Sequence, residues 1–172
     1  PATYTVQSTT EAIFEGVAAS ITAKQATIIS SRLLARIDTI KVRSGDTVSK
    51  GDVLITLENN DLSSSVIEAR EQVNAMIARH TEAKQNFIRA TELFNKKIAS
   101  QFDLDKSKAD YQSSKAELTA AKQSLAQAQT TLSYATLRAP IDGKVVDRFT
   151  EPGNTAQAGA KLLSLYNPLS LR

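Results

Sequence analysis

Hydrophobic residues recur with a 3.5-residue spacing in two long stretches in the middle of the chain. The first series runs from Leu62 to Phe94 in alternating steps of four and three, and every position in it except His80 is apolar. The second series runs from Leu104 to Ala135, with large and small side chains alternating. This spacing, sustained over roughly four heptads in each stretch, is typical of coiled-coil helices.

The segment between the two series predicts a turn between antiparallel helices. Ser100 precedes Asp103 by three residues, which is the spacing of a capping box at the start of a helix. Short connections between long helices give antiparallel neighbours, so we expect an α-helical hairpin over residues 61–136, with Asp61 as its first N-cap and the turn near 96–101. Each arm of about 35 residues would be roughly 50 Å long. One long helix that dimerises is the alternative, and the cap signal disfavours it.

The two flanks of the expected hairpin carry the same pattern, Gly-x-Thr-x-x-x-Gly-x-x-Leu-x-x-Leu, 108 positions apart. Each copy reads as short strands separated by glycine turns. A half of about 30 residues is too small to bury a core alone. We therefore expect the hairpin to bring residues 25–60 and 137–167 together in one β-sandwich. The glycines expected at its turns are Gly45, Gly51, Gly143, Gly153 and Gly159.

Composition changes this picture mainly by what it excludes. All six glycines and all four prolines lie outside residues 52–139, as expected for a long helical insertion. The chain has no cysteine and a single histidine, so thiolate sites and sites with two histidines are excluded. A net charge of +3 is too small to indicate nucleic-acid binding. No nucleophile–base pair, phosphate loop or metal-ligand cluster is present, so we do not expect an enzyme.

The two flanks resemble the half-motifs of a biotinyl/lipoyl-carrier domain, since Leu137–Val145, with the sequence LRAPIDGKV, is similar to the start of the second half. A lipoyl-like domain split by a long hairpin resembles the periplasmic adaptors, or HlyD-like membrane fusion proteins, of tripartite efflux pumps. The resemblance implies an α+β fold, with a long antiparallel coiled-coil hairpin inserted between two halves of a lipoyl-like β-sandwich. It also implies that residues 1–24 and 168–172 contribute to an adjacent, incomplete β-barrel domain.

Carrier domains hold their prosthetic group on a lysine in the tight turn that joins the two halves. The corresponding segment here, Leu57–Asp61, contains no lysine, and Lys50 lies in a different turn. We therefore expect the lipoyl-like domain to be unmodified and to carry no cofactor.

The expected hairpin tip carries the second part of the resemblance. In adaptors of resistance-nodulation-division (RND) transporters the tip has the pattern Arg-x3-Leu-x6-Ser, and Arg89, Leu93 and Ser100 match it in spacing. The resemblance implies that these residues dock on the periplasmic end of an outer-membrane channel. Taken singly, they also fit a solvated arginine, a hairpin core leucine and a helix cap. His80 fits a packed seam residue, and a pH-sensitive role is its alternative.

The resemblance implies a non-enzymatic adaptor in the periplasm, attached to the inner membrane by a segment absent from this sequence. Its implied partners are an inner-membrane efflux transporter of the proton-driven RND type, an outer-membrane channel, and further copies in a hexamer built as a trimer of dimers, with no nucleic acid. Multidrug efflux and antibiotic resistance would be its context. The alternatives are an adaptor of an ATP-driven exporter, a carrier domain holding biotin or lipoate, and a coiled-coil scaffold unrelated to efflux.

Overall fold

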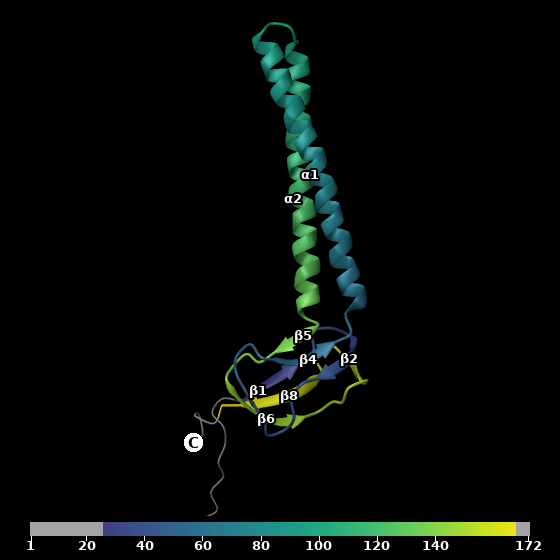
Figure 1. The fold of residues 1–172 in the computed structure, drawn as a ribbon, viewed down its shortest axis with the longest axis vertical. Helices are drawn as coiled ribbons and strands as arrows, with labels where there is room; N and C mark the ends of the chain where they lie inside the picture. Colours follow the sequence, from purple (N-terminus) through teal and green to yellow (C-terminus); the bar gives the residue numbers. More distant parts are fainter. Residues whose placement is uncertain (1–25, 168–172) are drawn as a thin grey trace, which may run out of the picture.

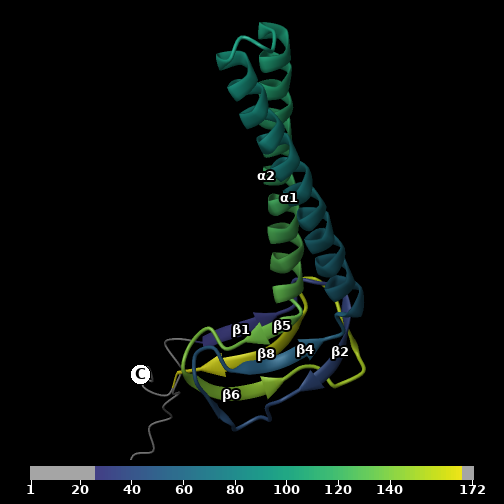
Figure 2. The same ribbon diagram turned by 45° about the horizontal axis from the view of Figure 1, so that its top comes forward.

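The computed structural model describes residues 26–167 and consists of a β-sandwich from which a two-helix hairpin projects (Figure 1). Helix α1 spans Asn60–Asn95 and helix α2 spans Gln101–Ser133. The two helices run antiparallel and wind about each other (Figures 1 and 2). The expected α+β class, with a hairpin inserted between the halves of a sandwich, is confirmed. The β-barrel strands expected within residues 1–24 and 168–172 lie outside the described residues.

Two antiparallel sheets form the sandwich. Their strands are β1 (Ala26–Ser30), β2 (Ala35–Ile40), β3 (Thr47–Val48), β4 (Val53–Leu57), β5 (Thr136–Arg138), β6 (Gly143–Arg148), β7 (Thr155–Ala156) and β8 (Lys161–Tyr166). One four-stranded sheet has the order β1-β8-β6-β3, and the other has the order β5-β4-β2-β7. Each sheet therefore takes strands from both flanks of the hairpin.

The duplicated sequence pattern corresponds to a duplicated arrangement of strands. A shift of 108 positions carries β2 onto β6, β3 onto β7 and β4 onto β8. The hydrogen bonds repeat as well. The amide of Gly45 donates to the carbonyl oxygen of Val145 at 2.8 Å, and the amide of Gly153 donates to the carbonyl oxygen of Ile37 at 2.8 Å. Each half thus closes its turn on a strand of the other half, so neither flank completes a sheet by itself.

The core of the sandwich lies between the two sheets and is centred on β4 and β8. These strands bury equivalent triplets at no more than 2% exposure, namely Leu54, Ile55 and Leu57, and Leu162, Leu163 and Leu165. Burial of this apolar surface is the main driving force that joins the two halves.

One of the glycines expected at turns does not have that role. Four of the expected turn glycines have φ between +84° and +96°, a region that favours glycine: Gly45, Gly51, Gly153 and Gly159. Gly143 does not share this conformation and instead begins strand β6. A Cβ atom at Gly143 would collide with the backbone carbonyl of Tyr166 on the paired strand β8. Close approach of two strands therefore explains this glycine.

The predicted coiled-coil seam is confirmed on both helices. Every residue of the two heptad series from Leu62 to Leu132 is buried or half-buried in the hairpin, and Ala135, beyond the end of α2, lies in the core of the sandwich. The buried helix residues are Val66, Val73, Ser114 and Ala121. A narrow seam, and no wide core, therefore holds the hairpin together.

A polar and aromatic layer interrupts the apolar seam near its middle. The hydroxyl of Ser114 donates to the carbonyl oxygen of Tyr111 at 2.8 Å, so the His80 Nδ1–H, 3.2 Å from the Ser114 Oγ, is the donor of that contact. The Tyr111 ring also stacks on the rings of His80 and Phe87, with centroid separations of 5.2 and 5.6 Å. These contacts pack His80 into the seam and fit the packed interpretation of this residue.

Helix α1 begins earlier than the sequence predicts. Its N-cap is Asn59, which makes no side-chain capping bond, and Asp61 lies within the first turn. The prediction of Asp61 as N-cap is therefore wrong in position. A carboxylate in the first turn still favours the helix through its interaction with the helix macrodipole.

Candidate functional site

The end of helix α1 is closed by a hydrogen-bonded turn. The amide of Ile98 donates to the carbonyl oxygen of Leu93 at 2.9 Å, and the amide of Lys97 donates to that of Phe94 at 2.8 Å. These two bonds, with Lys97 at φ +60°, form a Schellman motif, the usual C-terminal stop of a helix. Glycine is the usual residue at that left-handed position, so Lys97 is an exception.

The start of helix α2 is closed by the predicted capping box. The amide of Asp103 donates to the Ser100 Oγ at 3.2 Å, while the Ser100 amide donates to the Asp103 Oδ2 at 3.2 Å. The Ser100 hydroxyl also donates to the same carboxylate oxygen at 2.6 Å. The capping prediction for Ser100 is confirmed, and its side chain is engaged within the turn.

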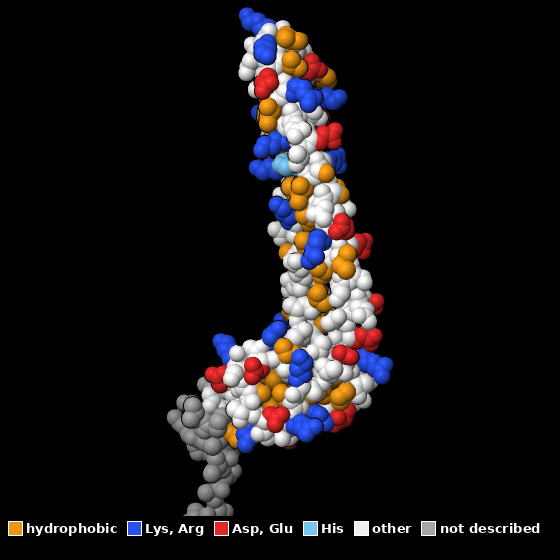
Figure 3. All heavy atoms as spheres, in the orientation of Figure 1, with side chains coloured by type: hydrophobic (Ala, Val, Ile, Leu, Met, Phe, Trp, Pro, Cys, Tyr) orange, Lys and Arg blue, Asp and Glu red, His pale blue; other side chains and the backbone are white. Residues whose placement is uncertain are grey.

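These bonds lower the pKa of a carboxyl group at the tip. The hydrogen bonds from the Ser100 hydroxyl and amide, the former contributing more, hold the pKa of Asp103 below its ordinary value, with a further contribution from Lys106. Asp103 is therefore ionised at neutral pH and keeps the cap formed. Lysine and arginine side chains gather with apolar ones at this end of the hairpin (Figure 3).

The three residues of the Arg-x3-Leu-x6-Ser pattern have different environments. Arg89 is exposed and makes no ion pair with any residue in the described range. Leu93, one helical turn further along α1, is half-buried. Ser100 is exposed but is the N-cap of α2. The structure thus places all three in or near the tip, with Arg89 free to contact a partner and Ser100 shaping the turn.

Residues 25–167 match the CzcB-like barrel-sandwich hybrid domain family. The chain belongs to this family. The match spans both halves of the sandwich and the whole hairpin, and it agrees with the predicted insertion of the hairpin into a β-sandwich.

Known relatives of this barrel-sandwich hybrid domain are longer proteins. Nodulation protein NolF of Rhizobium meliloti is 27% identical over 87% of this chain and 41% of its own length. Multidrug resistance protein MdtA of Photorhabdus laumondii is 24% identical over 81% of this chain and 35% of its own length. The chain thus spans less than half the length of either relative.

A solved structure supports the same fold. The membrane fusion protein Spr0693 of Streptococcus pneumoniae superposes with a TM-score of 0.68 over 88% of this chain and 63% of its own, at 19% identity. At that identity the likeness concerns the fold alone, and the fold is that of a membrane fusion protein.

Outside the tip, we searched the described part of this barrel-sandwich hybrid domain for metal sites and cavities. No three or more His, Cys, Asp or Glu side chains within residues 26–167 gather to hold a metal ion. An open hollow of about 430 Å³ at the base of the hairpin is lined mainly by polar residues such as Arg36, Glu58 and Asn59.

The Lys50 amide donates to the Asp142 carboxylate at 2.7 Å, so the Lys50 turn serves the contact between the two halves. No helix in the described range has the length and apolarity to cross a bilayer.

Sequence reasoning missed three tip residues. Lys97 occupies the left-handed position described above, and Ile98 and Phe102 are 70% and 74% exposed. Both apolar residues fall between the two heptad series. This position off the seam was the sequence signal that could have marked them as exposed. A hydrophobic residue off the seam and next to a helix cap has no packing role predicted for it.

Proposed function

We propose that the protein is a periplasmic adaptor that bridges an inner-membrane efflux transporter to an outer-membrane channel. The sandwich forms the body near the transporter, and the hairpin carries the tip roughly 50 Å away from it. The adaptor catalyses no reaction, and the transporter supplies the energy for export. The name of one relative, a multidrug resistance protein, agrees with a role in efflux.

The observation that carries this proposal is the combination of a long hairpin and a tip closed by two hydrogen-bonded caps, with the Arg-x3-Leu-x6-Ser spacing. Arg89 presents an exposed guanidinium that forms no ion pair within residues 26–167, and this group suits carboxylates or carbonyls on a partner. Leu93 supports the final turn of α1, and Ser100 fixes the start of α2. In this proposal Arg89 makes the direct docking contact, while Leu93 and Ser100 keep the tip in shape for it.

The remaining parts of the proposal concern the assembly of the adaptor and the class of its transporter. The sandwich supports self-association into a hexameric ring, built as a trimer of dimers, in the periplasm. The tip pattern favours a proton-driven RND transporter as the inner-membrane partner. Co-purification of the full-length adaptor with its transporter tests the class, because recovery of an ATP-binding subunit would replace the RND assignment with an ATP-driven one.

Charge reversal at Arg89 tests the docking role. A full-length adaptor with a photo-crosslinking amino acid at the exposed tip residue Asn95 is expressed in its own cells, and its crosslinks to the outer-membrane channel are measured along with drug susceptibility. Arg89→Asp is expected to lower both crosslinking and efflux. Arg70→Asp, which reverses an exposed arginine far down the same helix, is the matched control. Normal crosslinking and efflux with Arg89→Asp would sink the proposal.

A further inference from the structure

Lys97 holds a conformation that glycine would adopt more easily. Its φ of +60° lies in the left-handed region, where a Cβ atom is unfavourable. Both Schellman bonds are made by backbone atoms, so the turn itself has no need of a lysine side chain. A non-glycine residue held in the left-handed region is a recognised feature of functional sites.

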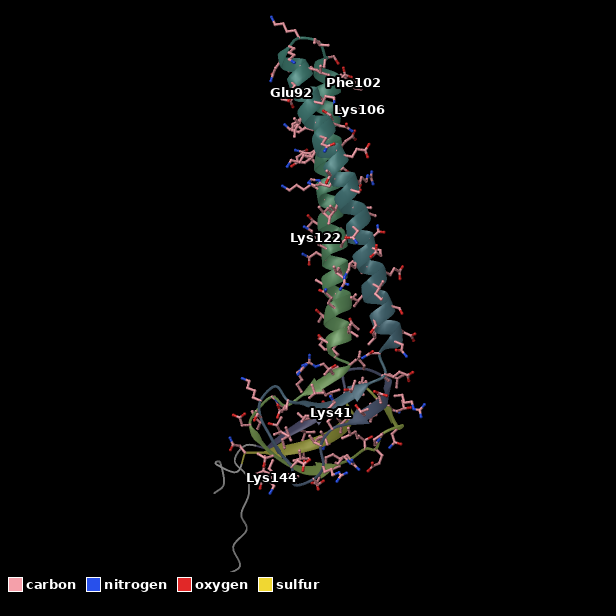
Figure 4. All side chains as sticks on the ribbon, viewed as in Figure 1. Lys41, Glu92, Phe102, Lys106, Lys122 and Lys144 are labelled. Atoms are coloured by element: carbon pink, nitrogen blue, oxygen red, sulfur yellow. The ribbon has the colours of Figure 1, made fainter. Side chains whose placement is uncertain are left out.

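Ile98, which follows Lys97 in the turn, and Phe102, in the first turn of α2, are also exposed at the tip. They are among the most exposed large hydrophobic side chains of the described residues, at 70% and 74%. Phe102 lies on the α2 side of the tip with Lys106, and Glu92 lies on the α1 side (Figure 4). The Schellman motif and the capping box on either side fix the backbone of both residues. Preorganised aromatic and aliphatic side chains of this kind are suited to fill a pocket on a protein partner.

The charges around these residues favour a protein surface over a lipid bilayer. Lys96 and Lys97 are exposed and form no ion pair with any residue among 26–167. Exposed carboxylates, Glu92 and Asp105, stand close to them along the chain. A bilayer with anionic headgroups attracts lysines but repels carboxylates. Mixed signs around an apolar centre instead match the polar rim and apolar core of a protein interface.

We propose that Lys97, Ile98 and Phe102 form a tip anchor that inserts into an apolar recess bordered by carboxylates on the channel protein. Ile98 and Phe102 fill the recess, and Lys97 pairs with a carboxylate at its border. The inference rests on the proposed function, because it names the tip residues that bind the same partner. It assigns direct contact to residues outside the Arg-x3-Leu-x6-Ser pattern.

The test uses the same full-length adaptor, with the photo-crosslinking residue at Asn95 and the yield of channel crosslinks as the readout. Phe102→Ser and Ile98→Ser are each expected to lower the yield about tenfold, as loss of an interface anchor does. Lys97→Gly separates fold from function. It relieves the left-handed strain, so the melting temperature of the hairpin is expected to stay or rise while the crosslinking yield falls several-fold.

Two controls match the apolar changes. Ile67→Ser and Ile77→Ser alter side chains of α1 that are 58% and 45% exposed and lie far from the tip. They are expected to leave the crosslinking yield unchanged. Circular dichroism melting of every variant identifies any that loses the hairpin, and Lys97→Gly keeps the test decisive if a serine variant unfolds.

The contrary outcomes are distinct from one another. Wild-type yields for all three tip-anchor variants, with loss for Arg89→Asp, would overturn the tip anchor and leave the proposed function intact. Wild-type yields for every variant, Arg89→Asp included, would overturn the proposed function itself. Flotation of the purified protein with phosphatidylethanolamine–phosphatidylglycerol vesicles that requires Phe102, without any effect of Phe102 on crosslinking, would replace the protein recess with a bilayer.

Discussion

The sandwich buries side chains from both flanks of the hairpin, and the triplets of β4 and β8 are no more than 2% exposed. In the hairpin, even the best covered apolar seam residues, Val66 and Val73, retain 6% and 7% exposure, and most other seam positions are only half-buried. Two helices that touch along one stripe bury much less apolar surface per residue than two facing sheets. Global stability therefore resides mainly in the sandwich, whereas the order of the distant tip depends on local caps and turns.

Matched leucine truncations are expected to separate the two regions most strongly. Leu163→Ala leaves a cavity at a position that is 0% exposed and is expected to cost about 2–5 kcal/mol of unfolding free energy. Leu125→Ala removes the same atoms from a half-buried seam position and is expected to cost about 1 kcal/mol, because neighbouring side chains and water fill the space. Urea unfolding measures both losses of unfolding free energy, and hydrogen exchange of peptides from each region shows where each loss occurs.

The pattern of exchange matters as much as the size of each loss. Leu163→Ala is expected to speed exchange in both flanks, since the two halves share one core. Leu125→Ala is expected to speed exchange in the helices and leave β4 and β8 protected. Equal costs, or loss of sandwich protection with Leu125→Ala, would show that the hairpin contributes to the common core more than its burial indicates.

The His80–Ser114 layer offers a smaller test within the hairpin. Ser114→Ala removes the oxygen that receives the Nδ1–H of His80, and leaving that donor unpaired in the seam is expected to cost about 1–2 kcal/mol. The double change His80→Leu with Ser114→Ala makes the layer apolar and is expected to recover that loss or exceed it. A double-mutant cycle of hairpin melting measures the coupling. Additive costs would mean that the two side chains do not interact.

The hairpin and the sandwich were predictable from sequence for different reasons. The seam repeats a local spacing that a coiled coil requires, so each helix can be predicted from its own stretch of sequence. The sandwich depends on contacts between distant segments, and the duplicated glycine pattern starting at Gly45 and Gly153 made its closure predictable. The role of Gly143 was not predictable, because the carbonyl of Tyr166 that excludes a side chain there comes from a different strand.

The candidate site was predictable only in part. The capping box at Ser100 and Asp103 is a local pattern and could be read directly. The left-handed conformation of Lys97 could not, because the signal for such a helix end is usually glycine. The exposure of Phe102 depends on where helix α2 begins and on which side of it faces α1, and a shift of one residue in that boundary would place the ring elsewhere.

Loss of the cap at the tip is expected to have the smallest effect on stability and a specific dependence on pH. Ser100→Ala is expected to cost about 0.5–1 kcal/mol. The Ser100 hydrogen bonds hold the pKa of Asp103 below its ordinary value. When folding lowers the pKa of a carboxyl group, its contribution to stability is fully present above its pKa in the unfolded chain, about 3.9. That contribution is lost as the pH falls through its pKa in the folded protein. The tip should therefore fray in acid below about pH 4, while the sandwich remains folded.

NMR titration of the Asp103 side-chain carboxyl carbon separates this local effect from general acid unfolding. In Ser100→Ala the pKa of Asp103 is expected to rise toward its ordinary value, because both the largest cause of the shift and the geometry of the turn are lost. Ser124→Ala, at an exposed position further along α2, is the control and should leave the titration unchanged. A pKa of Asp103 that stays low in Ser100→Ala would mean that charges at the tip, and not the cap, keep this carboxylate ionised, and the tip would then owe its order to the α1 turn alone.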